Sequence, residues 1–286
     1  INKDLSGLDD SGNQKRLPTQ LDAVVQEAKL TEECHGMQSK STQHQTLKLL
    51  SINILFISLW LITLLNPERL KVLWFAVVLL LAIVFIIKNK NTSKYDILTG
   101  IALGCLAMPS QVVMGACSAV AYIGGASVFK KSKNKITLFK ATNTKEITKT
   151  VGIMLITGAA LAIINILLAK SAMEFNFSIE PEWFLRAIKA GVSEEVIFRF
   201  FFFAVSVYCI KDGALSKFDN FLCYVIMILP HVLIHFDATT FTLSSVVVLA
   251  LLFGLPFAIM QRKRDLSSAI GAHTLVDAVR FCAFGA

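Results

Sequence analysis

Long apolar runs separated by short polar stretches fill the chain from residue 47 to its end. A transmembrane helix needs about 20 mainly apolar residues, so each run of roughly this length predicts one crossing of a membrane. Seven such runs occupy residues 47–65, 70–87, 151–168, 192–210, 221–236, 241–260 and 266–284. With the run described next, they predict an all-α fold, a polytopic transmembrane helix bundle of about 8 helices.

A further uncharged run of 33 residues, 97–129, contains Pro109. It is long for one crossing and short for two, which together take about 40 residues. Three lysines precede the run, and seven lysines with one acid follow it within residues 130–149. Basic residues collect on the cytoplasmic side, so a single crossing would leave one lysine group outside. We therefore expect a hairpin, as two passes or a re-entrant loop, bent near Pro109 and Ser110.

These patterns divide the chain into four parts. Residues 1–46 form a polar and flexible N-terminal tail, and residues 47–129 form N-terminal transmembrane helices. Residues 130–149 form a basic loop that the lysines place in the cytoplasm. Residues 150–286 form a C-terminal helix bundle, in which the acidic stretch 174–182 lies on the side opposite the lysines.

Composition agrees with a membrane protein. Of the 286 residues, 55% are hydrophobic, and the mean hydropathy is +0.62, too apolar for a soluble domain. The net charge of +8 reports orientation in such a protein, and we expect no nucleic acid as partner. The six cysteines are scattered without a CxxC pair, which predicts reduced, packed thiols. The predicted setting is a multi-pass position in the lipid bilayer of a bacterial cell membrane.

Two adjacent acids and an arginine interrupt the most aromatic of the runs. Glu194 and Glu195 open the sequence EEVIFR, which ends at Arg199 and leads into four phenylalanines. Charges inside a membrane helix are costly and mark a functional site by default. Glu195 and Arg199 are i,i+4 neighbours, so we expect an ion pair on the helix side away from the catalytic water. Glu194 points about 100° away and stays available for chemistry.

Two more helices carry titratable groups at the same i,i+4 spacing. His231 and His235 form one pair, and His273 and Asp277 form the other. Three polar sets on three helices in so apolar a chain are best explained by convergence on one cavity. We expect Glu194 to meet His235 and His273 there, close enough to share a water molecule.

The succession of EEVIFR, a histidine helix and HTLVD resembles the CPBP family of intramembrane proteases. That family includes CAAX prenyl endopeptidases of the Rce1 type and bacteriocin-processing or immunity proteins, and the resemblance covers about residues 150–286. It implies that Glu194 and His235 hold and deprotonate a water that attacks the scissile amide. It implies further that His273 and Asp277 stabilise the oxyanion. The substrate would be a peptide or a membrane-protein segment.

Three residues have supporting roles in this interpretation. Glu195 and Arg199 would fix the helix geometry. His231 stands where the family pattern has Phe, four residues before His235, and is the alternative to His235 as the catalytic histidine. His235 is preferred because the motif places its histidine near the helix end.

Other chemistries and functions stay open from the sequence. Zinc could be held by Glu194, His235 and His273 with a water in the fourth position, although HExxH is absent and catalysis without a cofactor is preferred. Ser193 lacks the surroundings of a nucleophile. The alternatives to a protease are a non-catalytic immunity or binding protein of the same fold and a small proton-coupled transporter.

Overall fold

The computed structural model describes residues 43–63, 67–140, 143–170, 173–210 and 214–285. The predicted tail lies outside these residues up to position 42, and a helix occupies Gln43–Thr63. The compact unit described below is Gln45–Ala286. The remaining helices are α2 (Pro67–Asn89), α3 (Lys94–Ala107), α4 (Val112–Phe129), α5 (Thr144–Ala169), α6 (Pro181–Glu194), η1 (Glu195–Phe201), α7 (Phe202–Ile210), α8 (Lys217–Leu233), α9 (Leu243–Leu249), η2 (Ala250–Gly254), α10 (Leu255–Lys263) and α11 (Leu266–Phe284).

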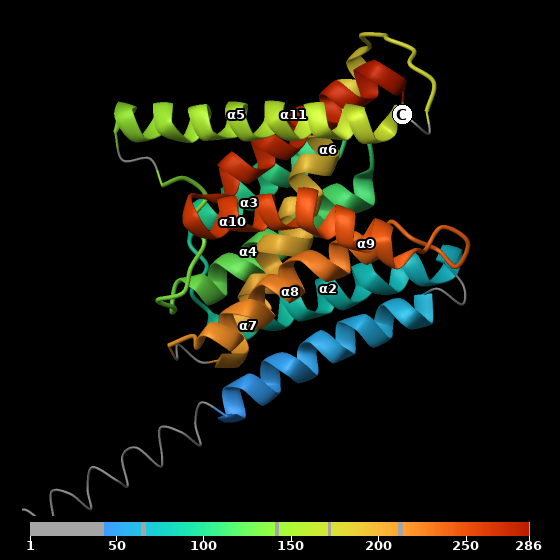
Figure 1. Ribbon diagram of the computed structural model, residues 1–286. Helices are drawn as coiled ribbons and strands as arrows, with labels where there is room; N and C mark the ends of the chain where they lie inside the picture. Colours follow the sequence, from blue (N-terminus) through green and yellow to red (C-terminus); the bar gives the residue numbers. More distant parts are fainter. Residues whose placement is uncertain (1–42, 64–66, 141–142, 171–172, 211–213, 286) are drawn as a thin grey trace, which may run out of the picture. The chain divides into compact units, whose positions relative to one another are not determined.

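All regular structure in the described residues is helical, which confirms the predicted helix bundle (Figure 1). The segments α6, η1 and α7 follow one another without a break, as do α9, η2 and α10. Five helices are long and apolar enough to cross a membrane: Gln43–Thr63, Val72–Asn89, Val112–Phe129, Thr144–Ala169 and Leu243–Lys263. The chain is therefore a multi-pass integral membrane protein.

Successive helices run in opposite directions, so the connections gather at two ends of the bundle. At one end, here called the lysine end, the connections are 90–93, 130–143, 214–216 and 264–265. There Lys131 Nζ donates to the Asn89 carbonyl at 3.1 Å, and the Leu266 amide to the Thr137 carbonyl at 2.9 Å.

The other end, here called the opposite end, holds the connections 108–111, 173–180 and 234–242. The amide of Ser178 donates to the carbonyl of Cys282 at 2.9 Å, and Trp60 Nε1 donates to the carbonyl of Leu233 at 2.7 Å. In Figure 1 the lysine end lies to the left and the opposite end to the right.

The long uncharged run forms the expected helical hairpin. α3 ends at Ala107, α4 begins at Val112, and the bend includes Pro109 and Ser110. The two helices pack through glycines: a Cβ on Gly104 would lie 2.7 Å from the Gly115 carbonyl oxygen. With 14 residues, α3 is about 21 Å long, shorter than the ~30 Å hydrocarbon core. The hairpin therefore combines one full-length helix with one short helix.

The basic segment is shorter than predicted. A loop was expected up to residue 149, but α5 begins at Thr144, because the Asn143 side chain caps it by accepting from the Glu146 amide at 3.0 Å. The loop also packs on the start of α11, where Ser267 Oγ donates to the Leu138 carbonyl at 2.7 Å. This packing joins the basic loop to the start of the last helix at one end of the bundle.

The helix that carries the glutamates lies at the centre of the bundle. All residues from Val196 to Val207 are buried, including the four consecutive phenylalanines. Phe200 stacks on Tyr122 of α4, and Phe202 packs on Phe56. These neighbours shield the charged segment from lipid, which a helix with acids and an arginine requires.

Candidate active site

The two glutamates lie where the central helix changes its winding. α6 ends at Glu194, and η1 is a π-helical segment that begins at Glu195. π-turns inside longer helices are frequent at functional sites, and their wider i→i+5 turn changes where side chains point. The two carboxylates share His273 but otherwise contact different partners, although they are adjacent in the chain.

Glu195 forms the predicted ion pair with Arg199, and both side chains are fully buried. The pair does not face away from the rest of the site, as the sequence analysis expected. Glu195 Oε1 also accepts from His273 Nδ1 at 2.7 Å, and Arg199 Nη2 lies 3.1 Å from His231 Nδ1. The physical reason is that buried charges must fill their remaining hydrogen-bonding positions, and the site histidines are within reach of both side chains.

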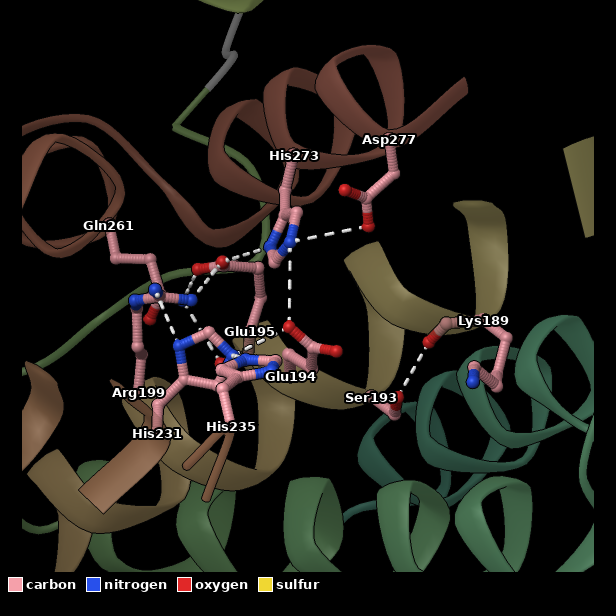
Figure 2. A network of polar contacts seen from close by, with 10 residues as sticks. All are labelled: Lys189, Ser193, Glu194, Glu195, Arg199, His231, His235, Gln261, His273 and Asp277. Carbon is pink, nitrogen blue, oxygen red and sulfur yellow. Dashed lines mark hydrogen bonds and ion pairs between the residues drawn. The ribbon is translucent and has the colours of Figure 1, made fainter. Parts of the chain in front are cut away.

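Glu194 completes a closed ring of five side chains (Figure 2). Its Oε2 lies 2.6 Å from His231 Nε2 and 3.5 Å from His273 Nε2. From His231 the ring passes to Arg199, then to Glu195, and then through His273 back to Glu194. The catalytic candidate and the buried ion pair thus belong to one polar network.

The predicted convergence of Glu194, His235 and His273 is confirmed, with His231 between them. His235 Nε2 lies 3.3 Å from His231 Nε2, so His235 reaches the carboxylate less directly than His231 does. The reason is local: α8 ends at Leu233, and His235 follows in an exposed turn. His231, still helical and 6% exposed, is the direct partner of Glu194.

The partners of His231 determine which of its ring nitrogens carries the proton. A guanidinium is a donor only, so Nδ1 of His231 accepts from Arg199 and must be unprotonated. The hydrogen then resides on Nε2, which donates to the carboxylate of Glu194. His231 is therefore a neutral imidazole that orients Glu194.

Two further candidates are placed clearly by the structure. Asp277 Oδ2 lies 3.6 Å from His273 Nε2, one turn along α11, and joins the group as predicted. Ser193 donates its hydroxyl hydrogen to the Lys189 carbonyl at 2.6 Å and points away from the glutamates in Figure 2. Its hydroxyl is therefore engaged with its own helix.

A cavity of about 620 Å³ contains the site. Its titratable lining consists of Glu194, His231, His235, His273 and Asp277 with four cations, Arg186, Lys189, Arg199 and Arg280. Apolar side chains from α5, η2, α10 and α11 line much of the remainder: Leu168, Ala169, Phe253, Phe257, Val276 and Phe281. The cavity thus combines a polar floor with walls that hold both apolar side chains and cations, a mixture common in binding sites.

Gln261 is a site residue that the sequence analysis missed. Basic residues follow it directly, but α10 continues to Lys263 and buries Gln261 to 1% exposure. Its Nε2 donates to Glu195 Oε2 at 2.7 Å and to the Glu195 carbonyl at 3.0 Å. No spacing signal in the sequence connects position 261 with position 195.

The candidate metal ligands differ from the predicted set. Ligand atoms of Glu194, His231 and His235 lie within 4.8 Å of one another, whereas the predicted set had His273 in place of His231. A histidine bound to zinc through Nε2 carries its hydrogen on Nδ1 and donates it to an acceptor. His231 Nδ1 faces the Arg199 donor, so this group fits a hydrogen-bonded pair better than a zinc site.

A polytopic helix bundle with a buried glutamate–histidine site at the floor of a cavity defines a candidate intramembrane hydrolase. Residues 176–279 match the family described as Type II CAAX prenyl endopeptidase Rce1-like. This match confirms the resemblance to the CPBP family of CAAX proteases, over a segment that contains every site residue named above. No curated protein and no solved structure matches the chain. The family supports a CAAX-type intramembrane protease in general.

Proposed function

We propose that the chain is an intramembrane endopeptidase in which Glu194 activates the attacking water. One observation carries this proposal: Glu194 Oε2 lies 2.6 Å from His231 Nε2 and 3.5 Å from His273 Nε2, on the floor of the cavity. A carboxylate so placed can accept a proton from water while two histidines fix its direction. Hydroxide adds to the scissile carbonyl, and the proton passes from Glu194 to the leaving amine.

The second half of the site serves the developing oxyanion. His273 Nδ1 donates to Glu195, which leaves Nε2 to face Glu194 and Asp277. With a proton on Nε2 as well, His273 donates to the oxyanion, and the Asp277 carboxylate stabilises the resulting imidazolium. Asp277 in this proposal positions His273 and does not itself contact the oxyanion.

Two other functions are less consistent with the geometry. A proton-coupled transporter needs access to its buried acids from both faces, but fully buried Glu195, Arg199 and Gln261 close the site toward the lysine end. A non-catalytic binding protein has no need for a carboxylate held by two histidines.

Purified protein with a peptide library, read by mass spectrometry, tests the proposal directly. New peptide termini are expected, and a complete lack of cleavage in detergent and in lipid would contradict the protease.

We expect catalysis to withstand chelation. His231 Nδ1 accepts from Arg199, which makes His231 unsuited to bind zinc through Nε2. Dialysis against a strong chelator should therefore leave turnover within about twofold of the untreated protein, whereas loss of a catalytic zinc would remove the several kcal/mol that a metal contributes. Loss of cleavage that added zinc restores would overturn metal-free catalysis.

The two histidines of the α8 region should differ in their effect. His231→Ala removes the direct partner of Glu194, so turnover should fall by about 10²-fold, the lower range for positioned acid–base catalysis. His235→Ala removes an exposed group one step further away and should cost less. Rates of the two purified variants on one peptide decide the order, and a larger loss for His235→Ala would assign the catalytic role to His235.

A further inference from the structure

The two ends of the bundle carry different charge. The lysine end and the helix turns beside it hold 13 of the 28 basic residues: Lys88, Lys90, Lys94, the seven lysines of 130–149, Arg262, Lys263 and Arg264. The opposite end holds fewer basic residues: Lys170 directly follows α5, and Arg69 and Lys71 stand in the first turns of α2 after Glu68. Its connections carry Glu174, Glu180 and Asp237. Hydrogen bonds from Thr239 and then Thr240 hold the pKa of Asp237 below its usual range, so that this carboxylate is charged. The positive-inside rule thus places the lysine end in the cytoplasm.

The cavity extends from the middle of the bundle toward the opposite end. Its lining on α5 comes from the last turns, Asn165, Leu168 and Ala169, and continues to Met173. α5 starts at the lysine end, so these residues lie near its far end. Leu168, which lines the cavity at this end, is 46% exposed. None of the described residues of the lysine-end connections lines it.

The floor of the cavity is closed on the side of the lysine end. Glu195 and Arg199 are fully buried, and Gln261, in the last turn of α10, covers Glu195 from that side. His231 lies two residues before the end of α8, at the opposite end. The reacting groups are therefore reached from the opposite end.

The cations near the cavity do not change this orientation. Arg186, Lys189 and Arg280 belong to the half of the bundle that faces the opposite end, and all three line the cavity. They stand in its wall, where a substrate passes, and not in a connection that determines orientation. They give the entrance a positive charge.

We propose that the site takes its substrate from the extracytoplasmic face of the membrane, as a polypeptide segment already exported or displayed there. This inference rests on the proposed protease function. It combines the position of the cavity with the charge of the two ends of the bundle. A protein tail held at the cytoplasmic surface would meet the lysine end, where buried side chains separate it from Glu194.

Cysteine labelling tests the direction of the cavity without any need for turnover. In a background with the six cysteines replaced, single variants Lys133→Cys, Glu174→Cys and Ala169→Cys report the lysine end, the opposite end and the cavity wall. A membrane-impermeant maleimide is applied to spheroplasts of an expressing bacterium and to inverted vesicles. We expect Glu174→Cys and Ala169→Cys to react in spheroplasts and Lys133→Cys to react only in inverted vesicles.

Each other outcome overturns the proposal. Reaction of the cavity cysteine only in inverted vesicles would place the entrance in the cytoplasm, and reaction from both sides would mean an open passage. An unreactive cavity cysteine beside a reactive Glu174→Cys would mean a cavity without access from outside.

A second measurement separates this inference from the proposed function. A peptide that the detergent-solubilised protein cleaves is added to sealed right-side-out and inverted vesicles. Right-side-out vesicles should cleave it within about twofold of the rate after detergent, and inverted vesicles should do so only after detergent. Absence of cleavage in detergent would contradict the protease and leave the labelling result intact. Cleavage by sealed inverted vesicles alone would contradict the extracytoplasmic entrance.

Discussion

Glu194→Gln should lower turnover by about 10²–10⁴-fold, the range that general acid–base catalysis contributes. The amide keeps the shape of the side chain and can still accept from His231 Nε2, but it cannot take a proton from water. The amount of protein in the membrane and its melting temperature should therefore change little. Initial rates on a cleaved peptide, with protein quantified in the same preparation, give the comparison.

A matched control lies on the same helix. Glu182 precedes Glu194 in α6, pairs with Arg186, and is exposed. Glu182→Gln makes the same chemical change outside the site and should leave turnover within about twofold, since exposed ion pairs contribute little. Equal losses in both variants, or full activity of Glu194→Gln, would contradict the assignment of Glu194 as the base.

The helix bundle and the meeting of its polar groups were predictable from the sequence because polar residues are rare in the apolar runs. Each charged side chain in such a run needs polar partners, which lie on the same helix at i,i+4 or on another polar helix. The hairpin was predictable for a related reason: the lysines on both sides of 97–129 fix both of its ends on one face. The membrane imposes both constraints, and both depend only on which residue types occur and in what order along the chain.

The individual side-chain contacts could not be predicted, because they depend on the local winding of the helix backbone and on the residue at which each helix ends. The π-turn at Glu195 is a feature of the backbone without a sequence signature, and it brings Glu195 toward His273. The end of α8 at Leu233 determines that His231, and not His235, contacts Glu194. The basic residues after Gln261 are typical of a cytoplasmic turn, yet α10 continues to Lys263 and Gln261 is buried.

The closed ring has a consequence for how function and stability are related. Because Arg199 contacts Glu195 and also His231, any change at Arg199 disturbs both the structural pair and the partner of Glu194. Arg199 is therefore not purely structural, because it also supports the partner of the catalytic candidate Glu194. Loss of Glu194 should spare stability, whereas loss of Arg199 should affect stability and activity together.

Arg199→Ala should destabilise the folded protein by about 3–5 kcal/mol, the cost of removing one partner from a buried ion pair. Glu195 is fully buried and would keep only Gln261 and His273 as partners for its charge. We expect a lower yield from membranes and a melting temperature well below that of the unaltered protein. Thermal denaturation in detergent measures the shift.

The chain offers an internal reference for this change. Glu182 and Arg186 repeat the Glu–Arg spacing of the buried pair, on the same continuous helix, but both side chains are exposed. Arg186→Ala removes the same atoms without burying a charge, so its effect on the melting temperature should be small. The difference between the two variants isolates the contribution of burial, since the residue types and the spacing are identical. Similar shifts for both would mean that Glu195 finds another partner or becomes protonated, and the pair would then not be required for the fold.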